Sequence, residues 1–386
     1  MLKTPLKYTL IFLGAAIIVV GTYVFSKIAN RPAQAPIAQT FFVDADYTPA
    51  QANAEAWLSA LYNNHQVPSV SAAIAAHGKL VWSGAIGYAD INQKILADNH
   101  SLYRIGSISK SLTAVVAIRM SEKNLFHIDS PFNRYVSGFP PEHTYTIKQL
   151  LAHQAGIRHY NGSLSDSFNT TEYSTTKDAT NIVKNDPLLF APGTGFRYTT
   201  YGYTLLSLAM ESAYAAPFEK IMTNEIISQL NLSDTYINKA NAQPKQNLTQ
   251  PYLFIHDTFF EAPEENVSHK YAGGGYLSTP TDLVKFGSAL LDNKFITPES
   301  RKLLWTPVPL TNGTMNPEHY ALGFRVGQDT AGTFVHHGGT TNGGYSFLLI
   351  YPESGIVVAF ASNFTSTGPS FDRLQEAKKL VGIFRH

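Results

Sequence analysis

The chain has 386 residues, of which 44% are apolar and 15% charged, with a net charge of +1 at pH 7 and no cysteine. This composition is typical of a large globular body rather than a disordered chain. The near-zero net charge gives no electrostatic basis for nucleic-acid binding, and the lack of cysteine excludes a thiol nucleophile, a disulfide framework and a thiolate metal site.

The N-terminal segment differs in composition from the rest. Two lysines precede an uncharged, mostly apolar run from Tyr8 to Phe25, which as a helix would span about 27 Å, close to the thickness of a bilayer core. Three interpretations fit: a transmembrane or signal anchor, a cleaved signal peptide, or a buried core helix. Ala33-Gln34-Ala35 resembles a signal-peptide cleavage site but lies far from the apolar run, which argues against a cleaved signal peptide. The run has no polar face, which argues against a buried core helix. An anchor within residues 1–31 is therefore favoured.

An anchored protein needs a linker and a body. We expect residues 32–48 to form the linker and residues 49–386 the body. The body is expected outside the cytoplasm, on the periplasmic or extracellular face of the membrane. Lysine and arginine are balanced across the apolar run, so the positive-inside rule adds little to this orientation.

Apolar periodicity and turn residues predict the elements of the body. In chain order they are a helix at 49–66, strands at 70–76 and 80–88, helices at 112–120, 147–153, 203–212, 218–230 and 282–291, strands at 321–326, 333–336, 346–351 and 356–362, and a helix at 370–383. Strands thus come from both ends of the chain, with a helical subdomain within about 125–265. This order predicts one sheet built from the terminal parts, with a cleft between the sheet and the helical insertion.

The first motif is Ser107-Ile108-Ser109-Lys110, of the form Ser-x-x-Lys. It lies between a strand-like segment and an apolar helix, and residues three apart share one helix face, so the Lys110 amine can approach the Ser107 hydroxyl. The helix N-terminus favours the negative charge that develops when a serine attacks a carbonyl. The alternative is that Ser107 caps the helix while Lys110 is solvated.

A second Ser-x-x-Lys sequence, Ser174 to Lys177, shows that the motif arises by chance. It lies in a polar stretch and is interpreted as a surface turn or helix cap.

Two further clusters can complete a serine-hydrolase site. Tyr198 follows a Pro/Gly-rich turn and precedes a helix; it can relay the serine proton if nearby cations lower its pKa. His336-His337-Gly338-Gly339 ends a strand, and its histidines can donate to the substrate while its glycines let backbone N–H groups approach a substrate oxygen. We expect neither a metal nor a cofactor.

With these clusters in order, the chain resembles the serine beta-lactamase and penicillin-binding-protein family, class C type, closest to its mitochondrial serine beta-lactamase-like branch and that branch's bacterial relatives. The resemblance covers about residues 50–385. It is carried by several segments: 67–70, 87–90, 103–110, 149–160, 192–203, 272–279 and 336–339.

The resemblance implies an α/β (α+β) fold with a mostly antiparallel sheet, flanking helices and a helical subdomain. It also implies roles. Ser107 is acylated, Lys110 assists its deprotonation, and Tyr198 takes the place of the tyrosine in the family's Tyr-x-Asn motif. His336 takes the place of the lysine in the Lys-Thr-Gly strand, and the N–H groups of Ser107 and Gly339 form the oxyanion hole.

Two departures from the family pattern bear on substrate. Thr200 replaces the asparagine of the tyrosine motif, and His336-His337 replaces Lys-Thr, so the cation that grips a beta-lactam carboxylate is absent. We therefore predict a peptidase, amidase or esterase rather than an efficient beta-lactamase, acting on a peptide, a peptidoglycan stem or a small ester. The alternative is a low-turnover scaffold, a homo-oligomer or filament that keeps the pocket.

Overall fold

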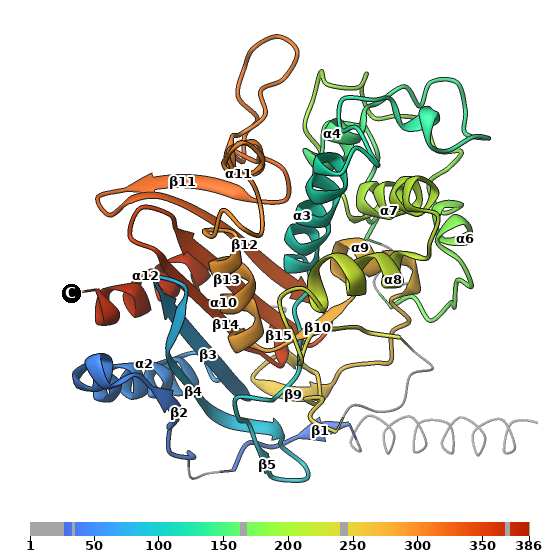
Figure 1. Cartoon of the computed structure of the whole chain (residues 1–386). Helices are drawn as coiled ribbons and strands as arrows, with labels where there is room; N and C mark the ends of the chain where they lie inside the picture. The colour runs from blue at the N-terminus through green and yellow to red at the C-terminus, as the bar shows by residue number, and fades with distance from the viewer. Residues whose placement is uncertain (1–26, 33–34, 163–167, 240–245, 367–370, 386) are drawn as a thin grey trace, which may run out of the picture.

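The computed structural model describes residues 27–32, 35–162, 168–239, 246–366 and 371–385 (Figure 1). Its strands, in chain order, are β1 (Ile28–Ala29), β2 (Gln39–Val43), β3 (Ser69–Ala76), β4 (Lys79–Asp90), β5 (Ile95–Leu96), β6 (Tyr103–Arg104), β7 (Tyr236–Ile237), β8 (Tyr252–Ile255), β9 (Thr258–Glu261), β10 (Tyr276–Ser278), β11 (Arg325–Asp329), β12 (Gly332–Thr341), β13 (Gly344–Tyr351), β14 (Ile356–Ser362) and β15 (Phe364–Ser366).

Its α-helices are α2 (Gln51–Asn64), α3 (Ile108–Glu122), α4 (Ile147–Leu151), α6 (Thr176–Thr180), α7 (Thr200–Tyr214), α8 (Phe218–Met222), α9 (Tyr271–Gly274), α10 (Pro280–Ala289), α11 (Pro298–Trp305) and α12 (Arg373–Phe384). Shorter helical turns are η1 (Ala45–Ala50), η2 (Phe132–Arg134), the π-helical η3 (Thr223–Ile227) and η4 (Ser268–Lys270).

The main sheet joins the two ends of the chain. Its strand order is β11-β12-β13-β14-β3-β4-β2, with β5 also paired to β4, and each of these pairings is antiparallel. The pairing of β14 with β3 brings the C-terminal strands beside the N-terminal hairpin. The predicted fold, an antiparallel sheet with a helical insertion, is therefore confirmed.

Helices cover both faces of this sheet because its strands are apolar on both sides. Along β14, Val357 and Ala359 pack into the cluster that contains α3, α7 and α10, whereas Val358 and Phe360 pack into the cluster that contains α2 and α12. This alternation follows from the two-residue repeat of a strand. Figure 1 shows α4, α6, α7 and α8 gathered beside the sheet, at the upper right.

Threonines cap the first turns of several helices. Thr199, Thr279 and Thr297 each accept a backbone N–H of the first helical turn, at α7, α10 and α11 respectively. Such capping satisfies N–H groups that have no partner inside the helix. The caps of α7 and α10 fix where these helices begin, and α7 begins at the candidate site.

The prediction of a membrane anchor is contradicted for the part of the chain that the structure describes. None of the described helices is both long and apolar enough to cross a bilayer. The apolar run from Tyr8 to Phe25, on which the prediction was based, lies outside the described residues. Within the predicted linker, β2 pairs with β4 at one edge of the main sheet.

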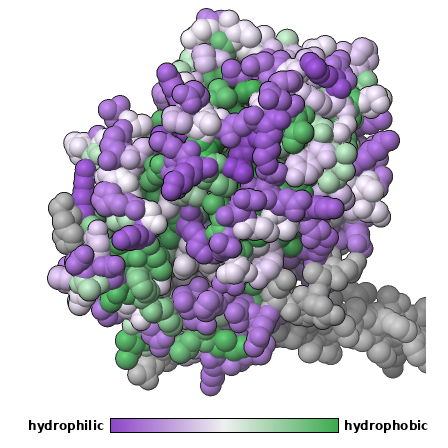
Figure 2. All heavy atoms as spheres, in the orientation of Figure 1, coloured by the Kyte–Doolittle hydropathy of each residue, from purple (hydrophilic) through white to green (hydrophobic). Residues whose placement is uncertain are grey.

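Hydrophobic side chains are exposed near that edge. Figure 2 shows hydrophobic atoms, in green, at the lower left of the view, where Figure 1 places β2. Phe41 and Phe42 of β2 and Ile95 and Leu96 of β5 are among the exposed large apolar residues. Polar side chains dominate much of the remaining visible surface.

Candidate active site

Ser107 stands at the N-cap of α3, immediately after β6 and the left-handed Gly106. Its side chain makes no capping hydrogen bond, in contrast to the N-cap threonines of α7 and α10. The alternative in which Ser107 serves as a helix cap is thus not what the structure shows. The hydroxyl remains available for chemistry beside the positive end of the helix dipole.

Lys110 lies one turn further along α3, and its side chain is completely buried. Its Nζ atom is 3.2 Å from Ser107 Oγ, 3.1 Å from Thr200 Oγ1 and 2.6 Å from the carbonyl oxygen of Gly273. Burial, followed by the charges of Arg325 and Lys270, holds the pKa of Lys110 well below its usual range. The amine is therefore a candidate for the neutral state, in which a lone pair can accept a proton.

The second Ser-x-x-Lys sequence has a different environment. Thr175 caps α6 by accepting the backbone N–H of Asp178, and both Ser174 and Lys177 are exposed. Ser174 borders a separate cavity. The structure thus distinguishes two sequence motifs that look alike.

Tyr198 lies beside the Ser107–Lys110 pair. Its ring centroid is 4.8 Å from Lys110 Nζ, and its hydroxyl hydrogen-bonds with Ser107. Burial raises the pKa of Tyr198 to about 12, although the charge of Arg325 and the bond to Ser107 act in the opposite direction. The expectation of a lowered tyrosine pKa is not met, so at neutral pH this side chain is a phenol that can donate a proton.

The two histidines of β12 point to different surroundings, because successive strand residues face opposite sides. His337 is fully buried; its Nε2 is 3.1 Å from the Tyr320 hydroxyl, and its ring lies 6.2 Å from that of Tyr198. His336 packs on Phe334 and Phe347, and its buried Nδ1 has no partner among the described residues. Both histidines line the cavity at Ser107, but it is His337 that is beside Tyr198.

The end of β12 packs against the turn that precedes Ser107. A Cβ atom on Gly339 would lie 1.9 Å from the carbonyl oxygen of Ile105, and one on Gly106 would lie 2.8 Å from the backbone nitrogen of Thr340. Gly338 and Thr340 line the cavity with Ser107, whereas Gly339 faces this backbone contact. Thr340 N is thus a second candidate for the oxyanion donor predicted at Gly339.

Two arginines of the cavity wall were not found by sequence reasoning. Arg325, on β11, lies over the rings of Tyr198 and Tyr320 and pairs with Glu318. Arg373, at the start of α12, donates to Gly339 O at 2.7 Å and to Thr340 Oγ1 at 3.0 Å. Neither belongs to a local motif, because only the β11–β12 pairing and the docking of α12 bring them to the site.

His153 and His159 support the Tyr198 segment from behind. His153 Nδ1 accepts the backbone N–H of Thr199 at 3.2 Å, and its ring lies 4.3 Å from that of Tyr198. His159 Nδ1 accepts the N–H of Thr200 at 3.3 Å. The bond between Thr199 and His153 orients the chain at Tyr198, which gives His153 a structural role.

These residues enclose a cavity of ≈ 440 Å³. Its described lining includes Ser107, Tyr198, two arginines and three histidines, and among these lining residues there is no carboxylate. In the described ranges no group of three His, Asp or Glu side chains could hold a metal ion. The cavity therefore combines the Ser107 hydroxyl with a cationic wall.

Comparison with known proteins gives consistent matches. Residues 53–383 match the family model described as Beta-lactamase. The mitochondrial serine beta-lactamase-like protein LACTB of Homo sapiens is 27% identical over 407 residues, covering 78% of this chain and 74% of that protein. Penicillin-binding protein 4* of Bacillus subtilis is 25% identical, covering 75% of this chain and 66% of that protein.

Solved structures share the fold. The octameric penicillin-binding protein homologue from Pyrococcus abyssi superposes with a TM-score of 0.75 at 22% identity, over 86% of this chain and 77% of that one. The D-amino acid amidase from Ochrobactrum anthropi SV3 gives a TM-score of 0.74 at 20% identity, over 86% of this chain and 98% of that one.

These relatives also bear on the predicted location. LACTB proteins of human, mouse and cattle are all described as mitochondrial. Together with the lack of a membrane-spanning helix in the described residues, this contradicts the predicted placement as an anchored domain on the periplasmic or extracellular face.

Proposed function

The chain belongs to the beta-lactamase family, and we propose that it is a serine hydrolase that forms an acyl-enzyme on Ser107. We propose further that it cleaves amide, peptide or ester bonds rather than acting as an efficient beta-lactamase. The observation that carries this proposal is the position of Lys110, whose buried amine lies 3.2 Å from the Ser107 hydroxyl.

The first step follows from that geometry. Lys110 donates to Gly273 O and Thr200 Oγ1, so a neutral amine can direct its lone pair at Ser107. Ser107 Oγ attacks the substrate carbonyl carbon, its proton passes to Lys110 Nζ, and a C–O bond forms. General-base assistance of this kind contributes about 10²–10⁴-fold in rate.

The second step requires a proton for the leaving group. When the tetrahedral intermediate collapses, the bond to the leaving amine or alcohol breaks, and the Tyr198 hydroxyl donates to the departing atom while Lys110 returns the proton to Tyr198. Water then attacks the acyl-enzyme by the reverse route, releasing the acid and restoring Ser107. The raised pKa of Tyr198 suits it to donate rather than to act as an anionic base.

Oxyanion stabilisation is proposed at the α3–β12 contact. The N–H of Ser107, at the start of α3, is one donor. We propose Thr340 N–H as the other, in place of Gly339, because Thr340 lines the cavity next to Gly106. Backbone donors fixed in place before the reaction are an effective way to stabilise the developing charge.

The cavity wall supports a substrate that carries an anionic group. Arg325 and Arg373 both line the cavity, and an arginine guanidinium binds carboxylates through paired hydrogen bonds. A free carboxylate near the scissile bond is present in C-terminal peptides. The amidases and penicillin-binding proteins among the structural neighbours support an amide or peptide substrate.

Two substitutions within the motifs support a function other than efficient beta-lactam hydrolysis. Thr200 supplies a hydroxyl where the resemblance implies an asparagine amide, and His337, rather than the predicted His336, stands beside Tyr198, where the resemblance implies a lysine. Burial, with the charges of Arg325 and Lys110, holds the pKa of His337 well below its usual range. A neutral imidazole does not replace a lysine cation.

The alternative is a low-turnover scaffold that self-associates. It draws support from the octameric assembly named for the Pyrococcus abyssi neighbour. Under this alternative the pocket would persist, but the serine would not be acylated at a useful rate.

Intact-mass spectrometry with a fluorophosphonate probe distinguishes the serine hydrolase from the low-turnover scaffold. We expect one phosphonyl adduct on the wild type and on Ser174→Ala, and none on Ser107→Ala, with all three proteins shown to be folded. A folded wild type that gains no adduct would contradict the hydrolase proposal and favour the scaffold. A fluorescent penicillin, tested in parallel, reports whether beta-lactams also acylate Ser107.

A further inference from the structure

A second cavity lies in the helical region, away from Ser107. It has a volume of ≈ 640 Å³, larger than the ≈ 440 Å³ at the nucleophile. Glu211 of α7 forms part of its wall, eleven residues and about 16 Å along that helix from Thr200. The cavity is thus a separate site, and its occupant need not be the substrate of Ser107.

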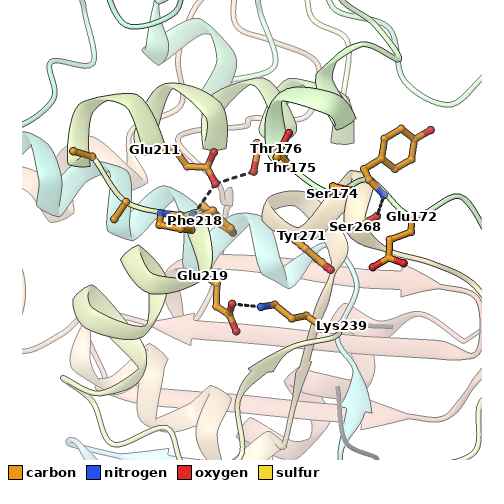
Figure 3. A pocket seen from close by; sticks show the side chains of 14 residues that line it. Glu172, Ser174, Thr175, Thr176, Glu211, Phe218, Glu219, Lys239, Ser268 and Tyr271 are labelled. Atoms are coloured by element: carbon orange, nitrogen blue, oxygen red, sulfur yellow. Dashed lines mark hydrogen bonds and ion pairs between the residues drawn. The ribbon is translucent and has the colours of Figure 1, made fainter. Parts of the chain in front are cut away.

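Glu211 has one carboxylate oxygen in use and one free. Figure 3 shows both of its hydrogen bonds: Oε1 accepts from Thr176 Oγ1 at 2.8 Å and from the backbone N–H of Phe218 at 2.7 Å. No described residue donates to Oε2 or pairs with Glu211 as a cation. Burial raises the pKa of this carboxyl, as expected for a partly desolvated carboxylate that lacks a counter-charge.

Other groups at the cavity add negative potential. Glu172 and Glu219 also line it, and Lys239, the one cation among its described lining residues, is paired with Glu219. The Tyr271 hydroxyl points between these two glutamates in Figure 3, and after burial their charges are the causes that raise its pKa. The net charge of the lining therefore attracts a cation and repels an anion.

Part of the remaining wall is apolar, although Ser174, Thr175, Thr176 and Ser268 also line the cavity. Phe218, Ala216 and Pro217 contribute aliphatic and aromatic surface, and Tyr271 presents a ring as well as a hydroxyl. A metal ion does not fit, because no described cluster of acidic or histidine side chains has the geometry to hold one. A ligand that combines a positive charge with an apolar body matches both parts of the lining.

We propose that this cavity is a binding site for a primary amine with an apolar or aromatic body. The ammonium group donates to Glu211 Oε2. The body of the ligand packs on Phe218 and on the ring of Tyr271. An ammonium has three donors, and both carboxylate hydrogen bonds and aromatic faces stabilise it. The site does not depend on acylation of Ser107.

Isothermal titration calorimetry with 2-phenylethylamine tests the proposal, with 2-phenylethanol as the matched ligand that lacks the charge. We expect saturable binding of the amine alone. Glu211→Gln should weaken it about tenfold or more, since it removes the charge of a hydrogen bond of the charge-assisted class. Glu353→Gln, on the exposed β13–β14 turn, should leave the affinity unchanged.

Two further measurements keep the test decisive. The glutamine of Glu211→Gln can still accept hydrogen bonds from Thr176 and Phe218, and a thermal melt checks that this variant folds. If it does not fold, Ala216→Phe is used instead. This variant places a larger side chain in the cavity and should abolish amine binding. Wild type with a fluorophosphonate on Ser107 should bind the amine as before. Equal affinity for amine and alcohol, no amine binding, an unchanged Glu211→Gln affinity in a folded variant, or loss of binding after phosphonylation would each overturn the proposal.

Discussion

Lys110 Nζ lies 3.1 Å from Thr200 Oγ1, and this contact ties the first turn of α3 to the first turn of α7. The same threonine hydroxyl hydrogen-bonds with Tyr160, whose ring stacks on His159. Thr200 therefore positions Lys110 and is itself positioned by Tyr160. A base positioned in this way needs little rearrangement to take the proton of Ser107.

Removing that contact should slow acylation without unfolding the protein. Thr200→Val keeps the side-chain shape but deletes the acceptor, and a net hydrogen bond is worth about 1 kcal/mol, or roughly a fivefold change in rate. We expect fluorophosphonate labelling of Ser107 to slow by about this factor, with Thr200→Ser close to wild type. A Thr200→Val protein that labels at the wild-type rate would show that this contact does not position Lys110.

The proton state of Lys110 predicts the pH dependence of labelling. The pKa of the buried amine is lowered, and only the neutral form can accept the serine proton, so the rate should rise with pH through that lowered pKa and then level off. The rise should come well below the usual lysine range. Stopped-flow or timed labelling across pH measures it.

The control for this profile is Lys110→Arg, which cannot lose its proton. Its labelling should fall by about 10²–10⁴-fold at every pH. A rate that climbs only near the ordinary lysine pKa would mean that Lys110 is charged in the folded protein, against the mechanism proposed here.

The cationic wall predicts a preference for anionic substrates. Arg373→Gln should reduce the ratio of kcat/KM for a peptide with a free C-terminal carboxylate over that for its C-terminal amide, by about tenfold, because a charge-assisted hydrogen bond is lost. Steady-state hydrolysis of the two peptides measures the ratio. The exposed Arg134→Gln is the matched control, and an unchanged ratio in Arg373→Gln would assign Arg373 a purely structural role on β12.

Buried histidines should make the fold sensitive to acid. Burial, followed by the charges of Arg325, Lys378 and Arg373, lowers the pKa of His336 to about 3, whereas an unfolded histidine titrates near 6.5. Between these values the unfolded state binds the extra proton, so stability is full above about pH 6.5 and is lost as the pH falls towards 3.

Thermal melts at several pH values test whether stability falls with pH in this direction. His336→Gln should show a smaller drop in Tm over that window than wild type, while His256→Gln, at an exposed position, should follow wild type. Part of the dependence of Tm on pH should persist in His336→Gln, because burial also lowers the pKa values of His153 and His337. Identical slopes in wild type and His336→Gln would contradict the shift at His336.

Local patterns predicted much of the sheet and of the helical frame. The strand expected at 356–362 coincides with β14, and Thr279-Pro280 begins α10 as a capped helix should. The short hairpin of β8 and β9 and helix α11 were not predicted, since each depends on tertiary packing more than on its own periodicity. The strand expected at 321–326 overlaps β11 by only two residues.

The candidate site was predictable where its residues share one motif. The three-residue spacing of Ser107 and Lys110 is enough to bring their side chains together on α3. The sequence could not show that His337 rather than His336 would lie beside Tyr198, because neighbouring residues of a strand point to opposite faces of the sheet. Arg325 and Arg373 reach the cavity only through long-range pairing, which no short pattern records.

The contact between Gly339 and Ile105 limits which substitutions this fold can accept during evolution. A single methyl group at 339 would collide with a main-chain carbonyl, and no rotamer of a neighbour could relieve the clash. Position 339 is therefore restricted to glycine, whereas Arg325, Arg373 and His336 line the cavity with side chains that do not enter this backbone contact. New substrate preferences can therefore arise by replacing the lining one residue at a time, while the spacing between nucleophile and strand is inherited intact.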